Sequence, residues 1–414
     1  MSTVPVGSQV GCLRNAVLTG GESVDVYLSG GRIARVERAG GTVIGPDDID
    51  LTGYLLVPAT AEPHAHLDKA LTFDEISPPM GDLSSAIAAW EAYTPSMTED
   101  SVAIRARAAA MTLLAHGTTA VRSHVNILRG SDPFRGIRAL VRVREELADL
   151  MDLQIVAMAP YFATESDVHR ALDLGADLVG GHPHQTPDPR GNLESLLAVA
   201  DAREVGVDIH TDERLDPEML TLEMLAESVV GWPESRSVTA SHCVSLGMVE
   251  PDVRSRVIEA VKVGRVGVVS LPITNLYLQG WDTPVATPRG LTAVRSLIDA
   301  GVMFAAGADN VRDPYNPLGR SDALETAMLL VTAAHLHVDE AYRAVSAGAR
   351  EVMSLPEVRI EAGSPAELLA IKAGSLVEAV ARAPLDRLVF HRGHLVSASR
   401  TELVQSTPEH LVQV

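Results

Sequence analysis

Eight short apolar runs, separated by amphipathic stretches, constrain the fold of this chain more than any other feature of its sequence. Most of the runs show little alternation of apolar and polar residues, which is typical of strands buried on both faces. The runs are Leu55–Ala59, Thr119–Arg122, Gln154–Ala159, Asp177–Gly180, Val207–Ile209, Val238–Ala240, Val266–Ser270 and Val302–Ala306. The stretches between them have the length and periodicity of helices and include Ser101–Ala115, Gly136–Leu150, Leu193–Glu204, Glu250–Val263 and Leu291–Ala300. Strands that alternate with helices in this way predict an α/β fold of the (β/α)8 TIM-type barrel class.

The chain is longer than such a barrel needs. It has 414 residues, whereas a bare barrel needs roughly 250. Short alternating runs occur near both ends of the chain, at Asn15–Thr19, Val24–Leu28, Arg32–Arg38, Glu367–Ile371, Arg387–Phe390 and Gly393–Val396. We therefore predict two domains. Residues 1–53 and 366–414 together form a small β-sandwich domain, and residues 54–365 form the barrel.

The charge and composition of the chain exclude several classes of partner. Its formal net charge is −20, and such an acidic surface repels nucleic-acid phosphates and anionic lipids. No apolar run approaches the roughly 18–20 residues of a membrane helix, and the first residues lack the basic and apolar segments of a signal peptide. Cys12 and Cys243 are too few for a disulfide framework. We therefore expect a cytoplasmic protein with no nucleic-acid and no membrane partner.

Polar residues follow the predicted strands where each strand ends. His64 and His66 come after the first run, and side chains two residues apart point to the same side of a strand. Two neutral imidazoles held in this way commonly chelate a divalent cation such as zinc or ferrous iron. The other strand ends carry Ser123, His124, His182, His184, His210, Glu213, His242 and Asp309. Because such a barrel has its active site at the carboxyl ends of its strands, the sequence predicts a metal-dependent site there.

Six motifs resemble those of a known enzyme family. They are Glu62–Asp68 (EPHAHLD), Ile209–Glu213 (IHTDE), Thr239–His242 (TASH), Leu278–Gly280 (LQG), Gly307–Asn310 (GADN) and Asp313–Gly319 (DPYNPLG). As a set they resemble the amidohydrolase superfamily and, more closely, its bacterial cytosine deaminase branch. The resemblance covers essentially the whole chain. It implies a metal-dependent hydrolase whose site lies on the first, fifth, sixth and eighth barrel strands.

The residue types of these motifs suit a single metal ion. His64, His66, His210 and Asp309 offer three nitrogens and one oxygen, which leaves one position open for water. The pKa of a water bound in this way falls from ~15.7 towards ~7, so that hydroxide is available at neutral pH. Residues 182–184 are a second HxH pair, which leaves a binuclear site open as an alternative. Binuclear members of the superfamily bridge their metals with a carboxylated lysine or an acid after the third or fourth strand, and the sequence has neither there. We therefore expect one divalent metal ion per chain, zinc or iron.

Three residues are expected to carry the proton chemistry. Glu213 lies three residues beyond His210 and can reach both the water and a substrate ring, so we predict that it is the proton shuttle. The resemblance implies that His242 hydrogen-bonds the attacking hydroxide and that Asp309 is both a ligand and a proton acceptor. The predicted reaction is the hydrolytic deamination of a small planar N-heterocycle. Hydroxide attacks the carbon that bears the amino group, and ammonia leaves.

Each of these residues also has an ordinary structural explanation. A histidine at a strand end is often a hydrogen-bonded core residue, a glutamate there is often a helix cap, and Asp309 could be a turn residue. The roles of His124, His182 and His184 stay open between the cavity wall and the core. Cys243 is expected to be a small buried hydrophobe and not a nucleophile. The coincidence of five such positions in the order of the family favours the catalytic interpretation.

Five residues are predicted to contact the substrate: Tyr161, His184, Asn310, Tyr315 and Lys69. His184 and Tyr315 match a histidine and an aromatic residue of the cytosine deaminase branch, and Lys69 could contact an anionic substituent. The chain departs from that branch at two places. The segment with Pro160 replaces a glutamine that reads the pyrimidine edge, and Asn310 replaces an aspartate. Because a site discriminates strongly through paired hydrogen bonds, cytosine itself is expected to be a poor substrate.

Two other functions remain as alternatives. The chain could hydrolyse another C–N bond, either in an alkylamino-triazine or in a cyclic amide. It could also be a catalytically silent barrel that acts as a binding protein, although the complete set of expected ligands and Glu213 argue against this. In both enzymatic interpretations the partner is a small heterocyclic molecule. We also expect the chain to form a homo-oligomer.

Overall fold

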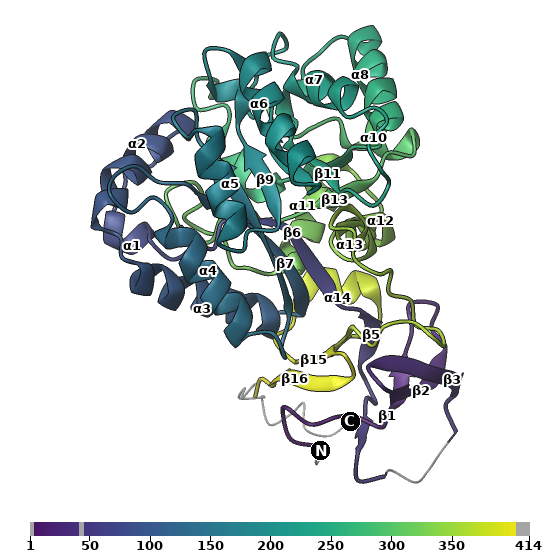
Figure 1. The fold of residues 1–414 in the computed structure, drawn as a ribbon. Coiled ribbons are helices and arrows are strands. Elements are labelled where there is room, and N and C mark those ends of the chain that lie inside the picture. The colour runs from purple at the N-terminus through teal and green to yellow at the C-terminus, as the bar shows by residue number, and fades with distance from the viewer. Residues whose placement is uncertain (1–3, 41–44, 403–414) are drawn as a thin grey trace, which may run out of the picture.

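Eight parallel strands form a nearly closed barrel in the computed structural model, which describes residues 4–40 and 45–402 (Figure 1). Each strand hydrogen-bonds to its neighbour in the sequence. In order they are β6 (Thr60–Ala65), β7 (Thr118–Asn126), β8 (Asp152–Ala159), β9 (Leu178–Gly181), β10 (Val207–Thr211), β11 (Val238–His242), β12 (Gly267–Ser270) and β13 (Phe304–Ala306). Most of their residues are buried, as expected for strands covered on both faces. The predicted fold class is confirmed.

The first and last strands of the barrel are joined through the segment that follows β13. The backbone N–H of Asp309 donates to the carbonyl of His64 at 3.1 Å, and the N–H of His66 donates to the carbonyl of Asp309 at 3.1 Å. The Glu62 carboxylate accepts two further bonds, from the N–H groups of Ala308 at 2.9 Å and His64 at 3.1 Å. Closure of the barrel therefore brings the two histidines of the first strand next to Asp309.

Helices surround the barrel (Figure 1). They are α1 (Phe73–Ile76), α2 (Leu83–Tyr93), α3 (Glu99–Ala115), α4 (Arg135–Glu146), α5 (Glu165–Asp173), α6 (Pro189–Ala202), α7 (Thr221–Ser228), α8 (Pro251–Gly264), α9 (Pro272–Leu278), α10 (Val294–Asp299), α11 (Ala323–Ala334), α12 (Val338–Ala344) and α13 (Ala347–Val352), with short 3₁₀ helices at Thr94–Ser96, Pro183–Gln185 and Val244–Gly247. All five predicted helices are present, with ends that differ by a few residues. Their starts follow local chemistry, since Thr98 caps α3 and proline opens α6 and α8. None of the helices within the described residues combines the length and apolarity needed to cross a membrane.

Both ends of the chain contribute to a second, mixed sheet, here called the chain-end sheet (Figure 1). Its strands are β1 (Cys12–Val17), β2 (Ser23–Ser29), β3 (Arg32–Arg38), β4 (Asp48–Asp50), β5 (Leu55–Pro58), β14 (Leu368–Ile371), β15 (Arg387–His391) and β16 (His394–Ser399), and α14 (Leu376–Arg382) connects β14 to β15. Hydrogen bonds connect the strands into one mixed sheet, which forms the additional domain expected from both chain ends. Apolar side chains from all eight share one core, among them Leu13, Ile33 and Phe390.

The predicted first barrel strand, Leu55–Ala59, is wrong. Leu55–Pro58 forms β5, which pairs antiparallel with β14 in the chain-end sheet. The first barrel strand is β6, and Ala59 alone separates the two strands. A search for apolar runs missed β6 because its buried residues include Glu62 and His64, which belong to the polar site. We therefore propose a domain boundary at Ala59 in place of the expected one between residues 53 and 54.

A buried arginine joins the chain-end sheet to the barrel. Arg387 of β15 donates to both carboxylate oxygens of Asp322, at 2.9 and 2.7 Å, and to the carbonyl of His116 at 2.6 Å. Asp322 also accepts from the N–H of Leu324 at the start of α11, and His116 directly follows α3. A fully buried cation from the chain-end sheet is therefore held by two barrel helices.

Candidate active site

The four expected metal ligands lie together at the carboxyl ends of the barrel strands. His66 Nε2 is 3.2 Å from His210 Nε2 and 3.3 Å from Asp309 Oδ1. His64 Nε2 is 3.6 Å from the same oxygen of Asp309. All four side chains are buried. Strand β6, strand β10 and the turn after β13 thus bring residues from three parts of the sequence into one cluster, here called the ligand cluster.

The donor atoms of the ligand cluster suit a cation. His64 Nε2 and Asp309 Oδ1 have no hydrogen-bond partner among the residues that the structure describes. Burial lowers the pKa of His64, His66 and His210 well below the usual range, so each imidazole is neutral and can offer a lone pair. Burial also raises the pKa of Asp309. Buried acceptors without donors are costly, and a divalent cation with nitrogen and oxygen ligands would satisfy them together.

His124 lies against the ligand cluster and not in the cavity wall. Its ring packs on the ring of His64, with centroids 4.0 Å apart, and its Nε2 is 3.4 Å from Asp208 Oδ1. The distances would allow His64, His124 and Asp208 to hold a second cation. Asp208 is already paired, however, because it accepts a hydrogen bond from Arg122 at 2.9 Å. His124 is therefore a core residue on β7, which runs to Asn126 and past the predicted end at Arg122.

Several residues at the strand ends have left-handed backbone conformations. The φ angle is +69° for His242, +64° for Asp309 and +52° for Asp212. A residue with a Cβ atom adopts this region at a cost of roughly 1–3 kcal/mol, and such residues cluster at functional sites. Here each of them ends or follows a strand, where the turn redirects the chain beside the ligand cluster. Part of the folding free energy is thus used to place these side chains.

Glu213 stands beside the ligand cluster with a protonated carboxyl group. It is buried, and its Oε1 is 3.5 Å from His242 Nδ1. Its backbone is held by Gln279, whose side-chain amide donates to the Glu213 carbonyl at 3.0 Å. Burial raises the pKa of Glu213 to about 8, and Arg214 opposes the shift only in part. The carboxyl group therefore carries a proton at neutral pH.

The neighbouring acid, Asp212, has a structural role. Its Oδ1 accepts from the backbone N–H of Thr221 at 2.7 Å, and its Oδ2 accepts from the N–H of Leu222 at 3.0 Å. These bonds satisfy the first turn of α7, which otherwise has unpaired donors. Of the two acids that follow β10, Glu213 alone is free to transfer protons.

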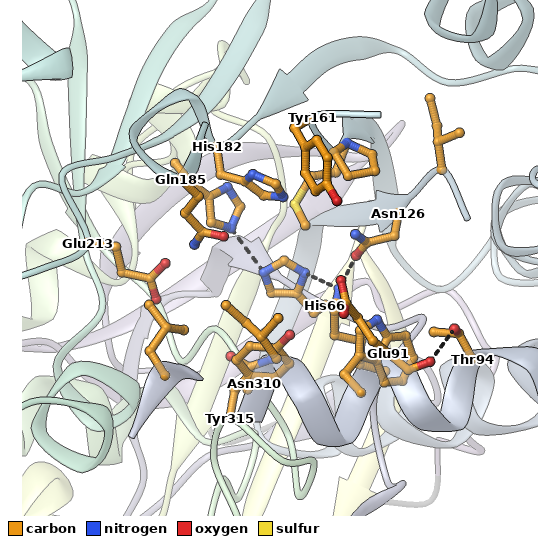
Figure 2. Close-up of a pocket in the computed structure, with 18 of the residues that line it drawn as sticks. His66, Glu91, Thr94, Asn126, Tyr161, His182, Gln185, Glu213, Asn310 and Tyr315 are labelled. Carbon is orange, nitrogen blue, oxygen red and sulfur yellow. Dashed lines mark hydrogen bonds between the residues drawn. The ribbon is translucent and has the colours of Figure 1, made fainter. Parts of the chain in front are cut away.

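A cavity of about 520 Å³ opens at the ligand cluster (Figure 2). His66, His210, Glu213, His242 and Asp309 line its buried end. Its apolar and aromatic walls comprise Leu83, Ile87, Trp90, Ile127, Leu128, Met158, Pro160, Tyr161, Phe162 and Tyr315. The volume lies within the ~300–1,000 Å³ of typical small-molecule sites. Walls of this kind suit a flat ring.

Four of the five predicted substrate residues line this cavity: Tyr161, Asn310, Tyr315 and Lys69. Figure 2 shows Tyr161 on one side of the cavity and Asn310 and Tyr315 on the other. The fifth, His184, is absent from the described residues that line the cavity, and its contact with substrate stays a prediction. Its Nδ1 bonds to the carbonyl of His210 at 3.0 Å, and its Nε2 is 3.9 Å from Glu213 Oε2. The 3₁₀ turn at 183–185 thus directs His184 towards β10 and behind Glu213.

Lys69 is a buried residue of the cavity wall. Its Nζ lies 3.1 Å from His66 Nδ1 and 3.4 Å from Asp68 Oδ1, and it donates to the side-chain oxygen of Asn126. It also lies over the ring of Trp90, 5.3 Å from the centroid. Only 2% of Lys69 is exposed. Lys69 is therefore a buried, ion-paired residue and not a surface residue.

Sequence analysis missed six polar residues that line the cavity: Glu91, Thr94, Asn126, Arg129, Gln185 and Arg214. Gln185 lies beside His182, whose role the sequence left open and which also lines the cavity (Figure 2). The signal for Gln185 was its place in the 3₁₀ turn directly after β9. Glutamine is common in exposed loops, so its type alone gave no reason to choose it. Its amide is of interest because it can donate to and accept from one edge of a ring.

Comparisons with known proteins agree with this arrangement. A sequence profile described as the amidohydrolase family matches residues 90–388. A pterin deaminase from Rhizobium rhizogenes (strain K84) is 30% identical over 412 residues, which cover 96% of this chain and 93% of that protein.

Two solved structures share the whole architecture. The crystal structure of 5-methylcytosine deaminase from Klebsiella pneumoniae, liganded with 5-fluorocytosine, has a TM-score of 0.88 at 29% identity and covers 95% of this chain and 99% of its own. The structure of N-isopropylammelide isopropylaminohydrolase from Burkholderia multivorans has a TM-score of 0.80 at 26% identity and covers 94% of this chain and 98% of its own. The similarity therefore includes both the barrel and the chain-end sheet.

Proposed function

This chain belongs to the amidohydrolase family, and from that premise we propose that it is a metal-dependent hydrolytic deaminase of a planar N-heterocycle. The observation that carries the proposal is the ligand cluster with the buried carboxyl group of Glu213 beside it. Nitrogens of three neutral imidazoles and an oxygen of Asp309 converge there, next to an acid that can deliver a proton. A silent binding barrel would gain nothing from buried polar groups that cost stability. The chain is a hydrolase of C–N bonds other than peptide bonds.

Glu213 performs the proton transfer in this proposal. A divalent cation bound by His64, His66, His210 and Asp309 would supply the nucleophile at neutral pH, because it lowers the pKa of a water molecule. Glu213 gives its proton to a ring nitrogen, which makes the carbon that bears the amino group more electrophilic. Water adds to that carbon and the C–N bond breaks. Of the two protons that water loses, one passes through Glu213 to the departing amino group and the other restores the protonated Glu213, so the products are a ring carbonyl and ammonia.

His242 orients the nucleophile. Burial lowers its pKa to about 3, so the imidazole stays neutral. Its Nδ1 is 3.3 Å from Asn275 Oδ1 and 3.5 Å from Glu213 Oε1, whereas its Nε2 has no partner among the described residues. One nitrogen is therefore tied to neighbouring side chains. The other is available for a hydrogen bond to the attacking water.

We propose a fused bicyclic ring of the pterin type as the preferred substrate. The pterin deaminase shares 30% identity with nearly the whole chain, and a cavity of about 520 Å³ is larger than a single pyrimidine ring requires. Met158 and Pro160 form the wall where the cytosine deaminase branch carries a glutamine. Each polar group of cytosine left unpaired in this wall would cost on the order of 1–3 kcal/mol. Tyr161 and Tyr315 offer aromatic faces for a larger ring.

A pyrimidine substrate is the second candidate, and Gln185 favours it. The amide of Gln185 enters the same cavity from the end of β9 and could pair with the pyrimidine edge in place of the missing glutamine. The 5-methylcytosine deaminase, at 29% identity, points to the same class.

Ammonia-release kinetics on the metal-replete enzyme separate these candidates. The assay compares pterin, 5-methylcytosine and cytosine, and adds N-isopropylammelide with detection of isopropylamine. We expect kcat/KM for pterin to reach the efficient range of ~10⁵ M⁻¹s⁻¹ or more, and cytosine to be at least ~10²-fold poorer. If 5-methylcytosine is best, Gln185 reads the ring and the pterin assignment is wrong. If N-isopropylammelide is best, the chain is a hydrolase of alkylamino-triazines.

We propose one metal ion per chain, zinc or iron. Strand β8 ends at Ala159 and is followed by Pro160, and β9 ends at Gly181. These positions offer no acid or lysine that could bridge two ions. Elemental analysis of active enzyme should give about one equivalent of metal. Two equivalents, both needed for activity, would contradict the mononuclear assignment.

We also propose that the protein is a cytoplasmic homo-oligomer. Cys12 and Cys243 are free and buried, which suits a reducing compartment. Trp281 and Val285, close together in the sequence, expose large apolar side chains of the kind that subunit contacts cover. Size-exclusion chromatography with light scattering should give a multiple of the 44.0 kDa chain mass, and a monomer would contradict this part of the proposal.

A further inference from the structure

A hydroxyl group bridges the expected ligand His64 to a carboxylate in the barrel interior. His64 Nδ1 is 2.8 Å from Ser241 Oγ, and Ser241 Oγ donates to Asp208 Oδ1 at 2.9 Å. His64 Nδ1 and Asp208 Oδ1 are 4.0 Å apart, which is too far for a direct hydrogen bond. None of the three side chains is exposed. Ser241 is therefore the sole hydrogen-bonded link between them in the described residues.

The far end of this link is a fixed acceptor. Asp208 Oδ2 accepts from Arg122 Nη1 at 2.9 Å, and Arg122 also donates to Thr239 at 2.8 Å and to Gln154 at 2.9 Å. A guanidinium group is always charged. The carboxylate paired with it has no proton to donate and can only accept.

The fixed acceptor sets the position of each proton in the link. A serine hydroxyl has one hydrogen, and Ser241 gives it to Asp208. Towards His64 the serine oxygen can then only accept, so Nδ1 of His64 must carry the imidazole proton. A neutral imidazole has one such proton, and the lone pair therefore lies on Nε2. This is the atom that faces Asp309 Oδ1 at 3.6 Å.

The other two expected histidine ligands lack such an anchor. Nδ1 of His66 faces Lys69 Nζ at 3.1 Å, and an ammonium group can only donate. Nδ1 of His210 has no hydrogen-bond partner among the residues described. Of the three histidines, His64 is thus the one whose Nδ1 bonds to an acceptor, the oxygen of Ser241. This bond fixes the tautomer that metal binding through Nε2 requires.

We infer that Ser241 is a positioning residue for metal binding, which holds the His64 imidazole with its Nε2 lone pair directed at the cation. The inference rests on the proposed function, since it concerns the same metal site. Outer partners of metal-binding histidines typically change metal affinity by 10–100-fold. Ser241 and Asp208 are not among the described residues that line the cavity. Their effect should therefore fall on metal affinity and not on KM for the substrate.

Zinc binding by the metal-stripped full chain, in competition with a chromophoric chelator at pH 7, tests this role. Ser241→Thr keeps the hydroxyl group, whereas Ser241→Val has the same shape as the threonine variant but no hydroxyl group. We expect Ser241→Thr to stay within about threefold of the unchanged protein and Ser241→Val to bind zinc about 10–100-fold more weakly. Excess zinc should restore the turnover of Ser241→Val with KM unchanged.

Ser270→Ala is the matched control. Ser270 ends the neighbouring strand β12, is equally buried, and its Oγ has no partner among the described residues. Equal zinc affinity in Ser241→Thr and Ser241→Val, or an equal loss in Ser270→Ala, would overturn the inference. Failure of the unchanged protein to bind either zinc or ferrous iron would instead contradict the proposed function. If Ser241→Val does not fold, Ser241→Ala provides the same comparison without added methyl groups.

Discussion

At the scale of single residues, Glu213 shows how surroundings give an ordinary side chain its chemistry. His184 and His242 face its two carboxyl oxygens, at 3.9 and 3.5 Å, and both imidazoles are kept neutral by burial. No lysine or arginine forms an ion pair with Glu213 among the described residues, and its only pairs are with these two histidines. The carboxyl group therefore holds a proton near neutral pH and can exchange it with a substrate.

Replacing Glu213 by glutamine should separate metal binding from turnover. We expect Glu213→Gln to keep the fold and the metal but to lose kcat by a factor on the order of 10²–10⁴, because the amide cannot transfer a proton. Metal content and kcat measured on the same sample test this. Asp212→Asn is the control, since it should weaken the start of α7 and lower the melting temperature more than it lowers kcat. A metallated Glu213→Gln enzyme with near-normal kcat would move the proton transfer to another residue.

The same residue should make the metal-free protein less stable at high pH. Burial raises the folded-state pKa of Glu213 from 4.5 to about 8, so the folded state binds this proton more tightly than the unfolded state. Stability therefore falls as the pH rises from about 4.5 to about 8, and the penalty above this window is on the order of a few kcal/mol. Glutamine has no such penalty.

Thermal unfolding in the presence of a chelator tests the sign of this effect. Glu213→Gln should melt at a higher temperature than the unchanged protein at pH 9, with a smaller difference at pH 5.5. A difference that is independent of pH would show that the carboxyl group is not desolvated in solution.

The residues that sequence alone could predict are those whose chemistry requires one side-chain type. Histidine and aspartate at strand ends are unusual enough to indicate a metal site, and Glu213 follows one of them. Ser241 could not be found in this way, because a serine within a strand is ordinary and its partner His64 lies 177 positions away. Gln185 was missed for a similar reason, since only the shape of the cavity gives it a role.

At the scale of elements, helix α13 packs on strand β13 through a glycine. A Cβ atom added at Gly348 would meet the backbone carbonyl oxygen of Phe304, which cannot move without shifting the strand. This close approach sets the distance between the helix and the strand. The same strand leads directly to Asp309, so the packing also supports the site.

Gly348→Ala should therefore destabilise the protein, although alanine is the better helix former. We expect a loss of about 1–3 kcal/mol from overpacking, opposed by the ~0.5–1 kcal/mol that alanine normally gains in a helix. Gly136→Ala in α4 is the control, because its Cβ would come no closer than 3.0 Å to a side-chain carbon of Val125 and 3.9 Å to the backbone oxygen of Asn126. Chemical denaturation of both variants tests this, and an equal or larger loss in Gly136→Ala would show that close backbone packing is not the cause.

Element prediction succeeded where burial and apolarity coincide and failed where they do not. Each strand from β7 to β13 contains a short apolar segment, and each was found with shifted ends. Strand β6 was missed because its buried side chains are polar, and the apolar run before it was assigned to the barrel in its place. An apolar run indicates burial but does not say which neighbour covers it. Strand β5 belongs to the chain-end sheet because it pairs with β14, which lies more than 300 residues later in the sequence.

At the scale of the whole molecule, the chain-end sheet and the barrel should unfold together. Arg387→Leu would leave the carboxylate of Asp322 buried and unpaired, and loss of one partner of a buried ion pair costs about 3–5 kcal/mol. Tryptophan fluorescence tests this well, because Trp90, Trp232 and Trp281 all lie in the barrel part of the chain. We expect Arg387→Leu to lower the midpoint of thermal unfolding by the same amount whether unfolding is followed by fluorescence or by circular dichroism.

The matched control is Arg359→Leu, which removes an exposed ion pair with Glu357. Because exposed pairs contribute little, its melting temperature should stay close to that of the unchanged protein. Separate fluorescence and circular dichroism transitions in Arg387→Leu would show that the two parts unfold independently.

The overall architecture was predictable because the alternation of strands and helices spans most of the chain. The resemblance of six motifs then predicted ligand residues that the structure brings together at the carboxyl ends of the barrel strands. Contacts such as that of Arg387 with Asp322 were beyond prediction, since nothing in either local sequence indicates the other. They follow from the way in which the two parts pack.

The short step from β5 to β6 also limits how such proteins can be recombined. One residue, Ala59, separates the chain-end sheet from the strand that carries His64 and His66. In a chimera of two related enzymes, a crossover at this point would join a β5 from one parent to a β6 from the other, with no intervening loop to absorb a mismatch. If the chain-end sheets of the two parents differ in orientation, the difference would displace His64 and His66 of the ligand cluster. Viable chimeras should therefore inherit the chain-end sheet and the first barrel strand from the same parent.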